Sequence, residues 1–273
     1  YQMRQAGFAT VSNTPMRSSD TPANAASGQT YGWVTAPDAS NWYFTQDITS
    51  RDSVFSEFYT AHFHESSKIT LFDNNHKQVG SFSVKVPEGW KHVADITPYG
   101  PITKKLFDRD EKSNEILVEF HDAFNGSNKY LTRAYDINTG EIKFEMEGTG
   151  LVFDASKGWN SYQRLIMTHE SDEKYSIDVI APPANGQTDW TVEHTFNFDI
   201  DNKITYLQGS CFNCMNVDGT PYYVLAEYDK PFTKTDAGDG STDIKQEPDN
   251  FLVLRTFDKS FNKVDSIRVS INA

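Results

Sequence analysis

Short runs of alternating hydrophobic and polar residues extend along most of the chain, and no long segment has helical spacing. From Tyr31 onward these runs are separated by clusters of Gly, Asn, Asp and Pro. Alternation with a period of two is the pattern of half-buried β-strands, and the clusters are typical of turns. The pattern predicts an all-β domain over residues 31–273, preceded by a polar tail or linker over residues 1–30 that is rich in Ser, Thr, Ala, Asn and Pro.

Three segments share one order of features: an apolar strand, an aromatic residue followed by Asp, a turn and a second apolar strand. They are ITLFDNNHKQVGSFSV, YLTRAYDINTGEIKFEM and FLVLRTFDKSFNKVDSIRV, with Asp73, Asp136 and Asp258 at the turn entry. An Asp at this position accepts hydrogen bonds from the backbone amides of its own loop. We therefore predict three copies of one hairpin. A fourth, looser copy follows Asp178, with a longer turn before Trp190.

A strand with a similar ending precedes each hairpin. The four strands are FYTAHFHES, ILVEFHDAF, RLIMTHESD and YVLAEYDKP. Aligned, they bring His64, His121 and His169 to one structural position, with Asp229 in the fourth copy. Equivalent positions in separate repeats stand apart, whereas a zinc ion needs ligands at about 2 Å. We therefore interpret these histidines as strand-end residues that contact a neighbouring turn, and not as a shared metal site.

One more short strand lies upstream of each pair, so the repeated units begin near residues 41, 92, 150 and 203. Four strands per unit at a period of about 50 residues are typical of a β-propeller blade. A β-sandwich is the alternative, because it also contains many short strands. Four blades are few for a ring, which leaves three alternatives for closure. The ring contains a fifth, irregular blade; the N-terminal tail adds a strand, for which residues 5–12, QAGFATVS, have strand character; or the chain is one part of a larger propeller or pairs with another subunit through open edges.

The hairpins, DINTGEIKF above all, resemble the outer strands of propeller repeats in the broad family that includes quinoprotein-type and six-bladed scaffold propellers. The long acidic and aromatic blades also resemble secreted or envelope proteins of gut Bacteroidetes. These resemblances imply a propeller fold and an extracytoplasmic location, and they name no activity. The WD40 blade ends are absent, and SKGW at residues 156–159 lacks the Ser-x-Asp-x-Gly order of the sialidase Asp box.

The net charge of the chain limits the classes of molecule that we expect it to bind. The formal net charge is −13, which argues against nucleic acid or an anionic membrane surface as the main partner. No run of 18 apolar residues exists, so we expect no transmembrane segment. Open sheet edges would allow the chain to form oligomers.

Two cysteines, Cys211 and Cys214, lie in the turn-rich segment GSCFNCMNVDG. A single CxxC does not supply the four ligands of a structural zinc site. A local disulfide is the favoured interpretation, with free thiols, metal binding and redox activity as the alternatives.

Three acidic loops offer oxygen ligands that suit calcium, although none has the EF-hand spacing. Their residues are Asp108, Asp110 and Glu115, then Asp199 and Asp201, then Asp236, Asp239 and Asp243. Such acids are common in turns, so these are weak candidates. We expect no other cofactor.

The sequence contains no GxSxG elbow, P-loop or dinucleotide fingerprint. We therefore expect an extracytoplasmic binding or scaffolding module that recognises protein or glycan, and we favour this over an enzyme. The alternative is a propeller-type glycan hydrolase that uses carboxylates in the axial mouth.

Overall fold

The structure is a computed structural model. It describes residues 30–35, 41–55, 61–90, 93–103, 107, 114–122, 129–154, 162–170, 175–181, 183, 189–198, 212–230, 233–236, 238, 242–245 and 249–270. The regular elements in these ranges are all β-strands, and no helix occurs among them, hence none long and apolar enough to cross a membrane. The predicted all-β class is thereby confirmed.

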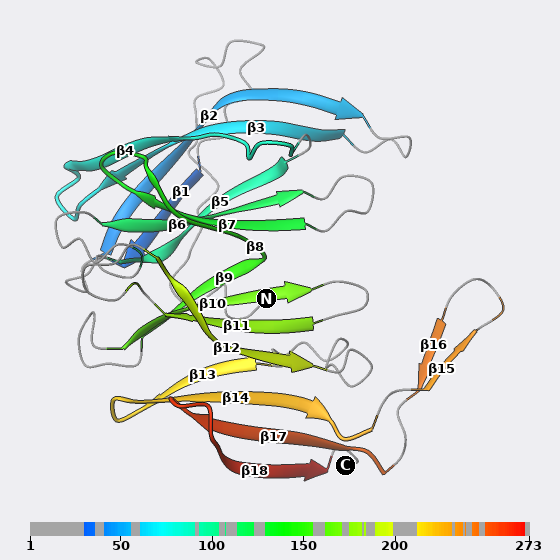
Figure 1. The fold of residues 1–273 in the computed structure, drawn as a ribbon. Helices are drawn as coiled ribbons and strands as arrows, with labels where there is room; N and C mark the ends of the chain where they lie inside the picture. Colours follow the sequence, from blue (N-terminus) through cyan, green and yellow to red (C-terminus); the bar gives the residue numbers. More distant parts are fainter. Residues whose placement is uncertain are drawn as a thin grey trace. The chain divides into compact units, whose positions relative to one another are not determined.

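The strands form four antiparallel sheets of four strands each (Figure 1). The first sheet contains β1 (Thr30–Thr35), β2 (Asn41–Phe55), β3 (Ala61–Phe72) and β4 (Gln78–Val84). The second contains β5 (Val93–Thr103), β6 (Glu115–Asp122), β7 (Lys129–Asp136) and β8 (Ile142–Glu147). In both sheets the spatial order of the strands follows the chain, so each strand pairs with the next.

The third sheet contains β9 (Thr149–Asp154), β10 (Gln163–Glu170), β11 (Tyr175–Ala181) and β12 (Thr191–Phe198), again in sequential order. The fourth contains β13 (Phe212–Val217), β14 (Thr220–Tyr228), β17 (Phe251–Asp258) and β18 (Lys263–Ser270). A separate two-stranded ribbon of β15 (Thr233–Asp236) and β16 (Thr242–Lys245) interrupts it between β14 and β17.

The chain divides into two compact units. The N-terminal unit contains the described residues up to Val152 together with Ala181–Thr191, and the C-terminal unit contains Phe153–Ile180 and the described residues from Val192 onward. The first two sheets lie in the N-terminal unit, whereas the fourth sheet and most of the third lie in the C-terminal unit. The assignment of residues 31–273 to one propeller domain stays a prediction.

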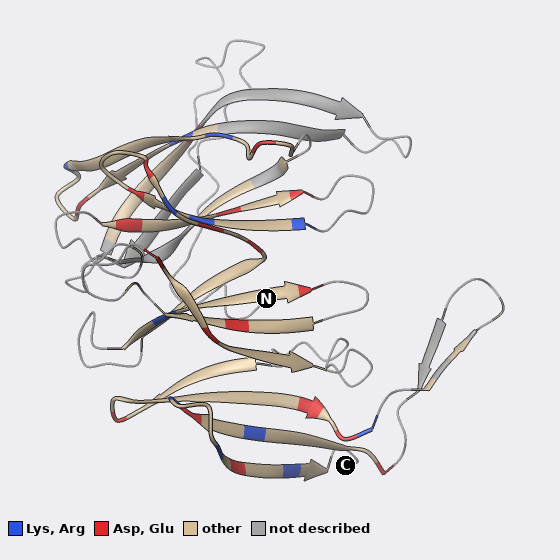
Figure 2. Ribbon diagram, viewed as in Figure 1, with Lys and Arg blue, Asp and Glu red and all other residues tan. Residues whose placement is uncertain are grey.

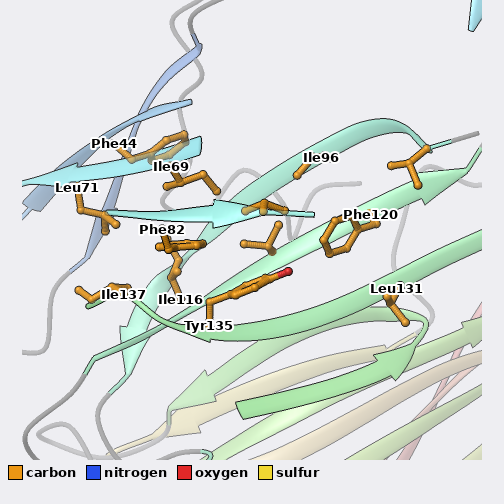
Figure 3. Close-up of a cluster of buried hydrophobic side chains, with 13 residues drawn as sticks. Phe44, Ile69, Leu71, Phe82, Ile96, Ile116, Phe120, Leu131, Tyr135 and Ile137 are labelled. Atoms are coloured by element: carbon orange, nitrogen blue, oxygen red, sulfur yellow. The ribbon is translucent and has the colours of Figure 1, made fainter. Parts of the chain in front are cut away.

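The core of the N-terminal unit lies between its two sheets. Phe44, Ile69 and Leu71 of the first sheet are fully buried. They belong to one cluster with Phe120 and Tyr135 of the second sheet (Figure 3). Burying large apolar side chains of this kind contributes about 1.5–3 kcal/mol each, so the cluster holds the two sheets face to face.

Aromatic rings fill the core of the C-terminal unit. The ring of Phe196 on β12 lies 5.5 Å from that of Phe212 on β13 and 6.0 Å from that of Tyr223 on β14. The hydroxyl of Tyr223, which is fully buried, lies 2.8 Å from that of Tyr162. A hydrogen bond between the two hydroxyls satisfies polar atoms inside an otherwise apolar layer. This layer joins the third and fourth sheets.

Two of the predicted repeat starts, near residues 92 and 150, lie next to Val93 and Thr149, which begin the second and third sheets. The first sheet begins one strand earlier than predicted, at Thr30, because TYGWVT pairs antiparallel with residues 41–46. The predicted start near 203 lies outside the described residues. The first described strand of the fourth sheet begins at Phe212.

Candidate functional site

The fourth sheet has two faces, which the strand register separates. One face, the inner face, packs on the third sheet through Phe212, Tyr223 and their neighbours. The other face, called the outer face from here on, consists of the alternate positions of all four strands. Its members are Asn213, Met215, Val217, Thr220, Tyr222, Val224, Ala226, Tyr228, Leu252, Leu254, Thr256, Asp258, Asp265, Ile267 and Val269.

The outer face is apolar, yet the described chain leaves much of it open. Ile267 is 52% exposed and Met215 is 43% exposed, whereas Tyr223 on the inner face is fully buried. Val224 and Leu254, on the two central strands, are only half-buried. On β6, by contrast, six consecutive residues that point to both faces are buried. Exposed apolar side chains on both edge strands of one sheet face, with half-buried ones on the strands between them, are typical of an interaction site.

Charge is confined to one end of the outer face. Asp258 lies opposite Tyr222, and Asp265 lies opposite Thr256, next to the β17–β18 turn. No position of the outer face is Lys or Arg. Figure 2 marks the charged residues of β18 on the ribbon. The face therefore offers an apolar surface with an acidic end, which complements an apolar surface bordered by basic groups.

The three predicted hairpin aspartates lie at the entries of β-turns. Asp73 Oδ1 accepts hydrogen bonds from the amides of residues 75 and 77, at 2.8 and 2.9 Å. Asp136 Oδ1 accepts from residues 138 and 139, and Asp258 Oδ1 from residues 260 and 262. The loop after Asp136 is one residue longer, since the Asp136 amide donates to the carbonyl of residue 141. Each carboxylate thus accepts hydrogen bonds from the backbone amides of its own loop and is not directed to a ligand.

Each loop also contains one residue with positive φ. It is His76 in the first, Gly140 in the second and Phe261 in the third, with φ of 60°, 74° and 65°. The left-handed conformation costs little for Gly and about 1–2 kcal/mol for other residues. Two of the loops adopt the left-handed conformation without Gly, which shows how strongly the hydrogen bonds to the Asp carboxylate fix the turn.

His121 and His169 occupy equivalent places, each one residue before the end of the second strand of its sheet. The ring of His121 stacks on Tyr130 with 4.4 Å between ring centroids. His169 Nε2 lies 3.0 Å from Asp178 Oδ2. In the fourth sheet, Asp229 Oδ2 accepts a hydrogen bond of 2.7 Å from Arg268. All three side chains contact partners within their own sheet.

Two residues differ from the predicted alignment. His64 lies in β3, the third strand of its sheet, because β3 runs from Ala61 to Phe72 without the turn expected after HES. It is therefore not equivalent to His121 and His169. Asp178 lies in the middle of β11 instead of at a turn entry. There its carboxylate accepts hydrogen bonds from His169 and from Thr195 Oγ1, the latter at 2.6 Å.

The remaining site predictions fall largely outside the described residues. Asp108, Asp110, Asp199, Asp201, Asp239 and Cys211 lie outside them, so the calcium sites and the disulfide stay predictions. Glu115 is a buried residue of β6. Cys214 on β13 forms no disulfide with another described residue, and burial raises the pKa of its thiol. In the described part of the chain, no three His, Cys, Asp or Glu side chains form a group that could hold a metal ion.

Reasoning from repeats missed the outer face, although a signal was present. In the segments YYVLAEY and FLVLRTF, apolar residues occupy both the odd and the even positions, so they point to both faces of the sheet. This pattern is typical of a strand that is covered on both faces. The packing of the sheets in three dimensions, and not this pattern, leaves one of the two faces open in the described part of the chain.

Comparisons with protein-family models, with curated proteins and with solved structures give no match to this chain.

Proposed function

We propose that this chain is an extracytoplasmic, β-propeller-like scaffolding module that binds another protein through the outer face of its fourth sheet. The observation that carries the proposal is the open apolar surface at Met215, Val217, Ile267 and Val269, each at least 40% exposed. The succession of four-stranded antiparallel sheets supports the propeller-like interpretation.

The charges of the outer face define the partner's chemistry. Asp258 and Asp265 lie at one end of the face, and the chain carries a net charge of −13. A partner with a flat apolar surface bordered by Lys or Arg would bury the valines and isoleucine and would place a basic group beside Asp265, while the Asp258 carboxylate stays bonded to its own loop. Electrostatic attraction would also raise the rate of association, and added salt would lower it.

A matched pair of substitutions tests the proposal. Ile267→Glu puts a charge on the outer face, whereas Ile142→Glu puts the same charge on β8, where the isoleucine is 45% exposed instead of 52%. After chemical crosslinking in an extract of the producing cells, mass spectrometry should place partner crosslinks on β13, β14, β17 and β18. These crosslinks should disappear with Ile267→Glu and persist with Ile142→Glu. Crosslinks confined to the first two sheets would contradict the proposal.

Glycan binding is a second candidate, because one exposed aromatic platform favours it. Tyr43 is 42% exposed, and its ring stacks on His76 at 5.8 Å. Exposed rings of this kind can stack on sugars. A glycan array distinguishes the two functions: binding that is lost with Tyr43→Ala and retained with Ile267→Glu would favour the glycan. The hydrolase alternative stays a prediction, and no described residue favours it.

A further inference from the structure

The fourth sheet has the residue pattern of a sheet that is covered on both faces. Its central strands, β14 and β17, carry apolar residues at both odd and even positions. Strand β11 of the third sheet has the same pattern, and there residues that point to both faces are buried, among them Val179 and Ile180. In the fourth sheet, Val224 and Leu254 of the outer face are only half-buried. The described chain thus leaves partly open a face whose composition suits burial.

The first sheet differs, because its face that points away from the second sheet is mostly polar. Asp47 lies opposite Lys68 on this face, and the hydroxyls of Thr70 and Ser81 lie 3.5 Å apart. The described members of the face are Tyr43, Thr45, Asp47, Lys68, Thr70, Phe72, Ser81 and Ser83. A polar face of this kind needs no covering layer, as in the terminal repeats of repeat proteins. The need for a further layer is therefore specific to the outer face of the fourth sheet.

The exposed apolar side chains of the outer face extend over the full width of the fourth sheet. Met215 and Val217 lie on β13, and Ile267 and Val269 lie on β18, which are its two edge strands (Figure 1). Neighbouring strands are about 4.8 Å apart, so the two edge strands are about 14 Å apart. One α-helix with its side chains is about 10–12 Å across and round in cross-section, so it contacts a narrower strip. A second sheet, packed about 10 Å above the first, contacts all four strands.

We propose that the partner of the outer face contributes a β-sheet, which packs face to face on the fourth sheet with apolar side chains between the two. This inference rests on the proposed function and specifies the structural class of the partner. Each compact unit already contains this mode of packing, with the first sheet on the second and the third on the fourth. A basic residue at one end of the partner's sheet lies beside Asp265.

A second copy of this chain does not have the features required of the partner. The first sheet of another copy would present a mostly polar face. The fourth sheet of another copy would present an apolar face without the Lys or Arg that complements Asp265, and each copy carries a net charge of −13, which opposes self-association. We therefore expect a complex with a different protein, and no head-to-tail chain of copies.

Site-specific photocrosslinking of the full chain in an extract of the producing cells tests the proposal. The photoreactive amino acid p-benzoylphenylalanine replaces one residue at a time: Met215 or Val217 on β13, Ile267 or Val269 on β18, and Ser83 of the first sheet as the control. Mass spectrometry then identifies the labelled residues of the partner. The β13 and β18 positions should label two segments of one protein. Within each segment the labelled residues should be two positions apart, because alternate residues of a strand point to one face. Ser83 should not label this protein.

The affinity of the identified, purified partner provides a second measurement. Met215→Glu and Ile267→Glu put a charge on opposite edge strands of the outer face. Each should weaken binding at least about 30-fold, because a sheet buries both positions. Ser83→Glu, at an exposed position of the first sheet, should leave the affinity unchanged.

Three results would overturn the proposal while leaving the outer face as a binding surface. Labelled partner residues spaced three or four positions apart would identify a helix. Loss of affinity with only one of the two Glu variants would show that the partner's contact element is narrower than a sheet. Crosslinks between two copies of this chain would identify a second copy as the partner. If neither Glu variant changes the affinity, or if none of the four outer-face positions gives a crosslink, the proposed function fails as well.

Discussion

Gly80 on β4 lies so close to Ile137 that a Cβ atom on the glycine would come within 2.6 Å of the Ile137 carbonyl oxygen. Ile137 belongs to the β7–β8 turn and is part of the buried cluster between the first two sheets. The clashing atom is backbone and cannot rotate away. The close packing of these two sheets therefore depends on the absence of a side chain at position 80.

We expect Gly80→Ala to lower the free energy of unfolding by about 1–3 kcal/mol, the usual cost of overpacking a core. Urea denaturation would measure it. Ser83→Ala, at an exposed position of the same strand, should change the free energy by less than about 0.5 kcal/mol. Equal effects of the two substitutions would show that the sheets are not in close contact at Gly80.

A second prediction concerns the hairpin loops. Asp136 is buried, and Asp136→Ala removes the acceptor of two loop amides. The loss should cost about 1–2 kcal/mol, as for a helix cap. Asp136→Asn keeps an acceptor oxygen and should cost less. A thermal melt of the three proteins checks the order, and an Asn variant as unstable as the Ala variant would mean that the carboxylate's charge, and not its acceptor geometry, stabilises the loop.

How far the sequence predicts the structure depends on the range of the interactions. The turns at Asp73, Asp136 and Asp258 use contacts within five residues, so local turn chemistry was sufficient to locate them. His64 is misaligned because HESS has the composition of a turn, whereas β3 continues through this segment and pairs with the long strand β2, with a shift of register between Ile48 and Ser50. Asp178 was misplaced because its partners, His169 and Thr195, come from neighbouring strands. The open outer face could not be predicted from the sequence. Apolar residues at both odd and even positions of a strand predict that both of its faces are buried, and they do not show which face stays exposed.

A pH dependence is expected from His194 on β12. Its ring stacks on Phe261 and meets Phe196 edge-on, each at 4.4 Å. Burial in this aromatic contact lowers the pKa of His194 below the ordinary value of 6.5. The folded state then binds fewer protons than the unfolded state, so acidification below pH 6.5 destabilises the fold until the folded-state pKa is passed. Above pH 6.5, where His194 is neutral in both the folded and the unfolded state, its titration does not change the free energy of unfolding.

Chemical denaturation at pH 7.5 and at pH 5 would measure this dependence. The loss of stability on acidification should be smaller in His194→Gln than in the wild type. An identical loss in both proteins would assign the pH dependence to other groups.

The strand-end histidine provides a further prediction. His169→Gln removes a hydrogen-bond partner of Asp178, and the free energy of unfolding should fall by on the order of 1 kcal/mol. Asp178→Ala should cost more, because it also removes the acceptor of Thr195. Neither change should alter metal content, measured by atomic emission. Stoichiometric zinc that is lost with His169→Gln would make His169 a metal ligand.

The most direct test of the account is the affinity of the crosslinked partner, once identified, for three purified proteins: wild type, Ile267→Glu and Ile142→Glu. A charge buried in an apolar interface costs at least about 2 kcal/mol, so Ile267→Glu should weaken binding by at least about 30-fold. All three proteins should have the same melting temperature within a few degrees, because both isoleucines are exposed. Ile142→Glu should bind like the wild type. Equal affinity of Ile267→Glu and the wild type would contradict binding through the outer face of the fourth sheet.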